Sequence, residues 1–399
     1  MNVAPAGILP CLNVLVVAPA MPPSIGGAES IAEVLTLGLA RTGDVTVHLV
    51  TSEHPRLVVQ DEISAAGGTV NCLGSQFGPR DGFVGWEWAT FARAEEIHSI
   101  CERYDIDVIH AMSHDTLLDA AIAVAGSNCV KRPVIVGTLS EVSTNYSAFG
   151  LARSKFIFRQ RIDGMLHLSD FYRLSAKQSG CTATHQIIAA AVDTSLFQSG
   201  DRVAKRKDLG LYENETMILC PSRFSPRKGQ LELLAAVEKL REDTTEHLTL
   251  IFGGSVNSGS PAYLGDLTDR ATSSAIRTRI IEIQRAEMPD FLAASDLVVF
   301  PSHFEGLGFA AIEAMCARRP VVVSEVSGFD EIPDAQGQLH FTKAADPDRL
   351  ADDLQQLIDA PDYRANLADS GHERAIRAFS IAPFIHSAIM LYRTCIDVT

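Results

Sequence analysis

Short apolar runs separated by stretches of helical spacing recur along the whole chain. In the first half, β-rich runs occupy 14–17, 45–50, 107–110 and 134–137, and helical patterns lie between them. Alternation of this kind is typical of parallel sheets that are covered by helices on both faces. The first half is therefore predicted to fold as a doubly wound, Rossmann-like α/β domain.

The same alternation starts again after about residue 200, where the charged, apolar-poor segment 201–208 predicts a linker. Further strands are expected at 217–220, 248–252, 280–283, 297–300 and 321–324. We therefore predict two Rossmann-like domains, at 1–200 and 201–379. Ligands of open α/β sheets bind at the carboxyl ends of the strands, so the two domains should face a central cleft.

The composition of the chain restricts the kinds of partner that the protein is expected to bind. The 399 residues carry a formal net charge of −15, which should repel nucleic acid at long range. No two of the eight cysteines are spaced as Cys-x-x-Cys, so free thiols in a reducing cytoplasm are expected. No apolar run is long enough to span a bilayer, and we expect no transmembrane segment.

The turns that follow the first strand of each half lack the dinucleotide fingerprint. They read Pro-Pro-Ser-Ile-Gly-Gly at 22–27 and Pro-Ser-Arg-Phe-Ser-Pro-Arg-Lys-Gly at 221–229, and neither contains Gly-x-Gly-x-x-Gly. A nicotinamide or flavin dinucleotide is therefore not the predicted ligand.

The segment 301–313 combines two glycines and two acids between a strand and a helix. Gly306 and Gly308 allow backbone N–H groups to approach a ligand, and a helix start suits a diphosphate. Glu305 in the turn can reach hydroxyl groups. Glu313 lies among apolar residues, where a carboxylate needs partners, and a ribose diol would supply them. The alternative is a pair of surface glutamates beside a tight turn.

A second group of charged residues follows the strand at 217–220. Arg223 and Lys228 are two cations at a strand end, where they can clamp a diphosphate and neutralise a leaving group. The alternative is a solvated basic turn. With Glu305, these cations form the predicted catalytic set.

These motifs carry a resemblance to a known family. Arg-x4-Lys-Gly at 223–229 and Glu-Gly-x-Gly-x4-Glu-Ala-Met at 305–315 resemble the retaining family 4 glycosyltransferases of the "glycosyl transferases group 1" superfamily. The likeness covers most of 215–360 and is thinner in the first half, where Gly26-Gly27-Ala28-Glu29 is similar to the family's glycine loop. It implies the GT-B fold, with a C-terminal helix at about 380–399 that crosses back onto the N-terminal domain.

The resemblance also implies roles for individual residues. Arg223 and Lys228 would hold the pyrophosphate of a UDP- or GDP-sugar, Glu305 the sugar hydroxyls and Glu313 the ribose. The other donor contacts would come from Gly26, Gly27, Gly253, Ile283, Gly306, Leu307, Gly308 and Phe309. The family transfers the sugar to a hydroxyl acceptor with retention, by a front-side mechanism, and needs neither a metal nor a bound cofactor. The acceptor would be a saccharide, a lipid-linked molecule or a small molecule.

The chain departs from the family at one position of the N-terminal half. Many relatives carry a histidine shortly after the strand at 134–137, where this chain reads Thr-Leu-Ser-Glu at 138–141. His110, His114 and His303 are candidates for an acceptor or sugar contact, and the alternative for each is a structural histidine. The rival functions are a nucleotide-sugar epimerase and a non-catalytic sugar-nucleotide-binding protein.

A basic segment with aromatic residues lies in the N-terminal half. Arginines and a lysine at 153, 155, 159 and 161 surround Phe156 and Phe158. The segment is interpreted either as a peripheral membrane contact or as a solvated helix face.

Overall fold

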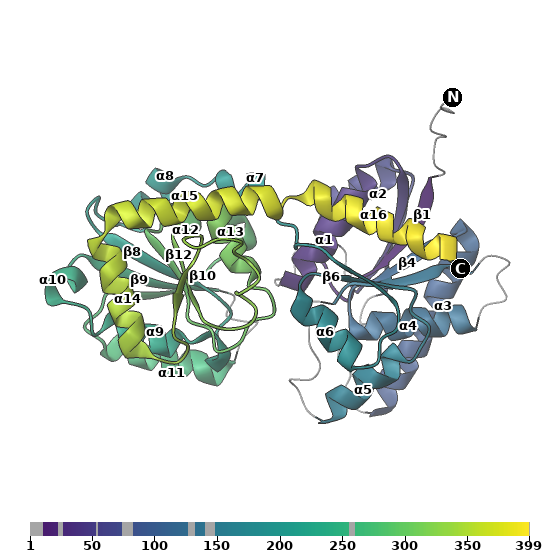
Figure 1. The fold of residues 1–399 in the computed structure, drawn as a ribbon, viewed down its shortest axis with the longest axis horizontal. Coiled ribbons are helices and arrows are strands. Elements are labelled where there is room, and N and C mark those ends of the chain that lie inside the picture. The colour runs from purple at the N-terminus through teal and green to yellow at the C-terminus, as the bar shows by residue number, and fades with distance from the viewer. Residues whose placement is uncertain are drawn as a thin grey trace. The chain divides into compact units, whose positions relative to one another are not determined.

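The computed structural model describes residues 11–22, 27–52, 55–73, 83–126, 132–139, 148–254 and 260–398, except for the side chains of 57, 83–89 and 148–150. The chain forms two compact units (Figure 1). Unit 1 comprises Met1–Ala189 and Ile381–Thr399, and unit 2 comprises Ala190–Ser380.

The boundary between the units lies earlier in the chain than the predicted position at 200. Residues 190–200 belong to unit 2 because α7 (Thr194–Gln198) packs on α12 (Met288–Ala294) and α13 (Phe309–Cys316). The charged segment at 201–208 is also not a linker. It forms α8 (Arg202–Asp208), whose Arg202 and Arg206 both pair with Asp296.

Unit 1 is built on a sheet of seven parallel strands in the order β3-β2-β1-β4-β5-β6-β7. The strands are β1 (Leu12–Val17), β2 (Val45–Thr51), β3 (Val70–Cys72), β4 (Val108–Ala111), β5 (Val134–Gly137), β6 (Gly164–His167) and β7 (Thr184–Ile187). Residues of β1 and β4 are almost entirely buried, as apolar runs in a doubly covered sheet should be. The strand order reverses between β1 and β4, and this is the position where open α/β sheets bind ligands.

Helices cover both faces of this sheet. They are α1 (Gly27–Ala40), α2 (Leu57–Ala65), α3 (Phe83–Tyr104), α4 (His114–Ala125), α5 (Ala148–Phe158), α6 (Asp170–Gln178) and α16 (Ile381–Val398). Apolar side chains of α3, α4 and α5 share one buried core with the strands. The last helix, α16, contacts α1, β5 and β6 and thus completes unit 1 (Figure 1).

Unit 2 repeats the design with six parallel strands in the order β10-β9-β8-β11-β12-β13. The strands are β8 (Thr216–Pro221), β9 (Leu248–Gly254), β10 (Thr278–Glu282), β11 (Leu297–Phe300), β12 (Val321–Ser324) and β13 (His340–Thr342). The sequence pattern did not reveal β13, which is three residues long and only partly buried. The order reverses between β8 and β11, so the expected site residues follow the two strands at this switch point.

The helices of unit 2 lie on both faces of its sheet. Besides α7, α8, α12 and α13, they are α9 (Gln230–Val237), α10 (Glu242–Thr245), α11 (Pro261–Ser273), α14 (Pro347–Asp359) and α15 (Pro361–Ala378), with the 3-10 turns η3 (Pro226–Lys228) and η4 (Arg285–Glu287). Side chains of α9, α11 and α14 join one core with the strands. The predicted fold class, two Rossmann-like α/β domains, is thus what both units adopt.

One helical stretch, Pro361–Val398, is long and apolar enough to cross a bilayer by length and composition. Its apolar part is α16, whose Phe384, Ile385, Leu391 and Tyr392 are buried. A helix that covers a sheet needs the same apolar face, so packing on unit 1 accounts for this composition.

Candidate functional site

The turn after β8 packs directly on the chain that follows β11. Gly229 ends the 3-10 turn η3 with φ 69°, and a Cβ atom at this position would lie 2.0 Å from the carbonyl oxygen of Pro301. Only glycine adopts this conformation without strain and leaves room for the Pro301 carbonyl. The two segments that the sequence singled out, 221–229 and 301–313, are therefore brought together.

Lys228 and Glu305 form an ion pair across this contact. The Lys228 ammonium donates to Oε1 of Glu305, and the Ser302 hydroxyl donates to the same oxygen at 2.9 Å. The two charged side chains are only 13% and 9% exposed. A buried carboxylate needs such donors, and this pair holds a cation and an acid together at the switch point.

Arg223 lies on the same turn, with an exposed side chain. Within the part of the chain that the structure describes, its guanidinium has no ion pair. Its carbonyl oxygen accepts a hydrogen bond of 2.9 Å from the amide of Gln230, a buried side chain at the start of α9. The backbone of Arg223 is thus fixed while its charge faces outward.

Arg227 ties the two segments together, a role that the sequence did not suggest. Its Nη1 donates to the carbonyl oxygen of Phe304 at 3.0 Å, and its own carbonyl accepts from the N–H of His303 at 2.8 Å. One side-chain bond and one backbone bond thus join the turn after β8 to the segment after β11.

The segment from Gly306 to Phe309 leads into α13. Gly308 is the N-cap residue with φ 71°, and a Cβ there would lie 2.4 Å from the ring of Phe329. Leu307 is buried, and no side chain caps the helix start. The N–H of Ala311 donates to the Gly308 carbonyl at 2.9 Å, and the N–H groups of Phe309 and Ala310 at the helix start can serve as donors for an anion.

Glu313 is buried inside α13, and its partner in the structure is Arg285. Nη1 of Arg285 donates to Oε1 of Glu313 at 3.0 Å, and its guanidinium also lies over the ring of Phe197, 5.6 Å from the centroid. Burial raises the pKa of Glu313, and the charge of Arg285 opposes this shift. The sequence did not reveal this ion pair, because the two residues are 28 positions apart.

Two other expected donor-binding residues contact each other. The side chain of Ile283 is buried and packs against Gly253, at the end of β9. Gly253 is the penultimate residue of β9 and Ile283 directly follows the neighbouring strand β10, at the edge of the sheet where Arg285 begins η4.

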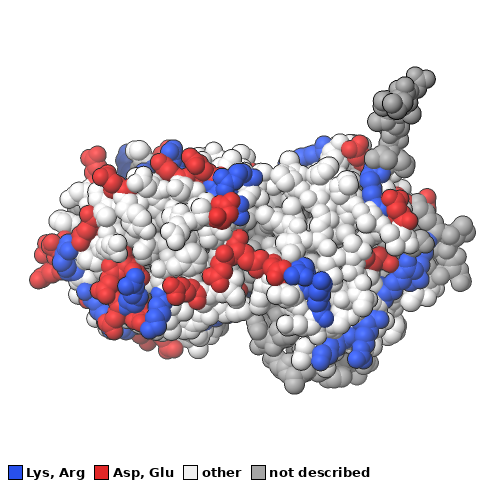
Figure 2. Space-filling model, in the orientation of Figure 1, with Lys and Arg blue, Asp and Glu red and all other residues white. Residues whose placement is uncertain are grey.

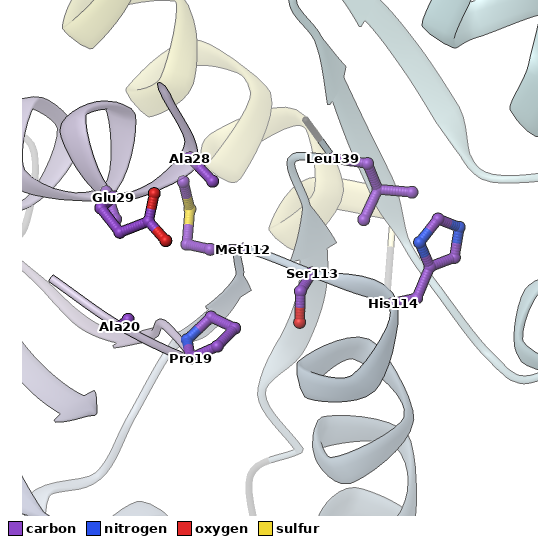
Figure 3. Close-up of a pocket in the computed structure, with 9 residues that line it drawn as sticks. Pro19, Ala20, Ala28, Glu29, Met112, Ser113, His114 and Leu139 are labelled. Atoms are coloured by element: carbon purple, nitrogen blue, oxygen red, sulfur yellow. The ribbon is translucent and has the colours of Figure 1, made fainter. Parts of the chain in front are cut away.

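Unit 1 has a pocket at its own switch point (Figure 3). The pocket lies where β1 and β4 end and where α1 and α4 begin. Its lining comprises Pro19, Ala20, Ala28, Glu29, Ala32, Met112, Ser113, His114 and Leu139. Gly27 is the first residue of α1, whereas Gly26 lies outside the described residues.

The three candidate histidines differ in their surroundings. His114 lines this pocket, and burial together with the charge of Arg153 lowers its pKa to about 4. His303 is partly exposed and its Nε2 lies 3.0 Å from Oε1 of Glu232, so it contacts α9.

Of the two interpretations of His110, an acceptor contact or a structural histidine, the structure supports the structural one. Its ring is fully buried, with Nδ1 2.5 Å from the hydroxyl of Tyr392 and Nε2 2.8 Å from that of Thr138. Both ring nitrogens are thus occupied, and burial lowers the pKa to about 3. His110 fastens α16 to β4, and a strand-end position alone could not reveal a partner 282 residues away.

Comparison with known proteins identifies the C-terminal half of the chain. Residues 201–374 match the family "Glycosyl transferases group 1". The D-inositol 3-phosphate glycosyltransferase of Frankia alni is 32% identical over 233 residues, which are 56% of this chain and 55% of that protein. The MMP alpha-(1->4)-mannosyltransferase of Mycolicibacterium hassiacum is 28% identical over 212 residues, 53% of this chain and 48% of that protein. The chain thus spans about half the length of these curated relatives.

Solved structures share the fold over almost the whole chain. Anabaena Alr3699/HepE in complex with UDP and glucose has a TM-score of 0.79 at 20% identity, covering 96% of this chain and 100% of that one. The sucrose-phosphate synthase of Thermosynechococcus elongatus has a TM-score of 0.80 at 18% identity, covering 97% and 100%. The fold is therefore the GT-B fold of glycosyltransferase structures, and residues 201–374 match the glycosyl transferases group 1 family.

Proposed function

We propose that this protein is a retaining glycosyltransferase that moves a sugar from a UDP- or GDP-sugar to a hydroxyl acceptor without a metal ion. The observation that carries the proposal is the buried contact of Lys228 with Glu305 at the switch point of unit 2. A cation and an acid held there suit the two ends of a sugar diphosphate, since one neutralises phosphate and the other accepts sugar hydroxyl bonds.

In this proposal the donor replaces the internal ion pair of Lys228 and Glu305. The pyrophosphate takes the charge of Lys228 and Arg223 and the N–H groups at the start of α13. Glu305 then turns to the sugar hydroxyls, and Glu313, oriented by Arg285, accepts bonds from the ribose. The departing diphosphate, stabilised by the two cations, helps to deprotonate the attacking hydroxyl on the same face of the sugar, which gives retention.

The comparisons guide the choice of donor. The Anabaena structure contains UDP and glucose, so UDP-glucose is the first donor to test. The described cysteines are free thiols, which supports the expected placement in the cytoplasm. A non-catalytic sugar-nucleotide-binding protein and a nucleotide-sugar epimerase are the rivals. Release of nucleotide diphosphate separates a transferase from the first, and transfer of the sugar to an acceptor separates it from the second.

The test combines binding and turnover. We expect UDP or GDP, and their sugars, to raise the melting temperature of the full chain, because they bind the folded state. The enzyme should also slowly release nucleotide diphosphate from its donor, and the product should keep the donor's anomeric configuration by NMR. Lys228→Met should lose both signals, whereas Lys207→Met, which removes an exposed charge from α8, should keep them. If no nucleotide diphosphate shifts the melting temperature, the proposal is wrong.

A further inference from the structure

The pocket of unit 1 has an unusual charge balance for a site that would receive a phosphorylated molecule. Among the nine described residues that line it, none is lysine or arginine, and Glu29 contributes a carboxylate. The other polar groups are the hydroxyl of Ser113 and the imidazole of His114, and the rest of the lining is apolar (Figure 3). An anion in this pocket would meet a negative charge without a neighbouring cation.

His114 does not supply the missing positive charge. Burial and the charge of Arg153 lower its pKa to about 4, so the ring is neutral near pH 7 and offers one donor and one acceptor. Arg153 itself forms an ion pair with Asp115, in the first turn of α4. The cation beside His114 is therefore already balanced inside the protein.

Two helices begin at this pocket, and helix starts attract anions. The protein itself places an acidic side chain in the first turn of each helix. Glu29 lies in the first turn of α1 and Asp115 in the first turn of α4. The Ser113 side chain caps α4 by accepting a hydrogen bond from the N–H of Thr116. The helix ends thus have internal acids and a cap and do not require a phosphate.

The described residues that line a second pocket beside His114 likewise include no lysine or arginine. This second pocket also has His114 and Leu139 in its lining, so the two pockets are neighbours. Its polar lining consists of the hydroxyls of Tyr172, Ser154, Ser175 and Ser179. Elsewhere the charges are mixed: Figure 2 shows acidic and basic side chains interspersed on the visible face of unit 2, so the net charge of −15 does not form one patch there.

We propose that the pocket of unit 1 selects an uncharged polyhydroxylated acceptor, such as a sugar or cyclitol without phosphate, and that Glu29 is the residue that recognises its hydroxyls. The inference rests on the proposed function and names its acceptor class. Hydroxyl donors suit a carboxylate, while Met112 and Leu139 cover the C–H face of the ring. This chain would differ from the Frankia alni relative, whose name contains an inositol phosphate.

The test uses matched pairs of acceptors with the full chain and the donor that gives the strongest thermal shift. The pairs are glucose and glucose 6-phosphate, mannose and mannose 6-phosphate, and inositol and inositol 1-phosphate. We expect kcat/KM to be at least about tenfold higher for the uncharged member of the preferred pair. Glu29→Gln should raise KM for that acceptor and reduce the preference, and Ala28→Lys should shift it toward the phosphate. Asp61→Asn, which removes an exposed acid from α2 outside the pocket, should change neither.

Each outcome decides the inference. Higher kcat/KM for the phosphorylated members, transfer to none of the uncharged ones, or an unchanged preference in Glu29→Gln overturns it. In these three cases normal donor binding and hydrolysis would leave the proposed function standing. Loss of donor binding in the wild-type chain overturns both.

Discussion

Arg285 and Glu313 form an ion pair inside unit 2, with Nη1 of the guanidinium 3.0 Å from Oε1 of the carboxylate. The arginine follows β10 and the acid lies in α13, so the pair joins two elements around the expected ribose position. Burial raises the pKa of Glu313 and Arg285 opposes that shift. Arg285 is thus a positioning residue that favours the ionised form of the acid and orients it.

Arg285→Gln should therefore make nucleotide binding more sensitive to acid. Without the guanidinium the pKa of Glu313 rises further, and a protonated acid accepts fewer hydrogen bonds from a ribose. We expect UDP or GDP affinity to fall by about tenfold more than in the wild type between about pH 7.5 and about pH 5.5, measured by titration calorimetry. Arg279→Gln, which removes a charge from the other end of β10, serves as the control. Parallel pH profiles for Arg285→Gln and the wild type would contradict this role.

The ion pair of Lys228 and Glu305 gives a second prediction. Removal of one buried partner leaves an uncompensated charge, so Lys228→Met should lower stability by about 3 kcal/mol. The double variant K228M/E305Q should recover much of that stability, because no buried charge is left. Its turnover should stay at least about 100-fold below the wild type, since the leaving group and sugar have lost their partners. Urea unfolding and donor turnover, measured on the wild type, Lys228→Met, Glu305→Gln and the double variant, test this prediction. A double variant with wild-type turnover would refute the catalytic assignment.

The sequence predicted the fold class and the two segments that the structure brings together in the candidate donor site, but not how their side chains pair. Arg223, Lys228, Glu305 and Glu313 were identified because local strand–turn–helix patterns mark the carboxyl ends of strands. The residues that pair with these side chains in the absence of a ligand could not be predicted in this way. Ser302 is close to Glu305 in the chain, but no periodic pattern indicated that its hydroxyl would bind the carboxylate. Arg285 and Glu313 are distant in the sequence, and only the folded chain brings them together.

The errors have similar causes. The segment 201–208 seemed too polar for an ordered element, yet Arg202 and Arg206 bury much of their length and bind Asp296 and carbonyl groups after α12. Nothing in the sequence around His110 indicated that its ring would contact the hydroxyl of Tyr392. Long-range pairing between polar side chains leaves no periodic pattern, whereas apolar faces do.

Gly229 is the basis of a prediction about the contact between the turn and β11. Gly229→Ala places a Cβ on the Pro301 carbonyl in a left-handed conformation, which should cost about 1–3 kcal/mol of stability and displace Lys228. Gly265 is the matched control, because it lies within α11 and its Cβ would meet nothing within 4 Å. Gly265→Ala should stabilise by about 0.5–1 kcal/mol. Denaturant midpoints measure both changes, and equal effects would argue against the proposed strain.

Because His110 is buried, we expect the free energy of unfolding to depend on pH. Burial lowers its pKa in the folded state to about 3, below the ordinary value of 6.5. The unfolded chain therefore takes up the proton first, and this histidine's contribution is complete above about pH 6.5 and is lost as the pH falls toward 3. Between pH 7 and pH 5 the loss is about 2 kcal/mol. His110→Asn should reduce the difference in unfolding free energy between these two pH values by that amount, whatever its own stability. His386→Asn, an exposed change on α16, should not.

Metal independence is the last prediction, and the charges around the donor site support it. A transferase that binds its diphosphate through a cation bridge needs carboxylate or imidazole ligands. In the described part of the chain, no group of three or more His, Cys, Asp or Glu residues could hold a metal ion. Arg223, Lys228 and the start of α13 instead offer fixed positive charge to the leaving group. Treatment with excess EDTA should leave the rate of nucleotide diphosphate release within about twofold of the untreated enzyme. Complete loss that Mg²⁺ or Mn²⁺ restores would show that the two cations are insufficient and that the donor arrives with a metal.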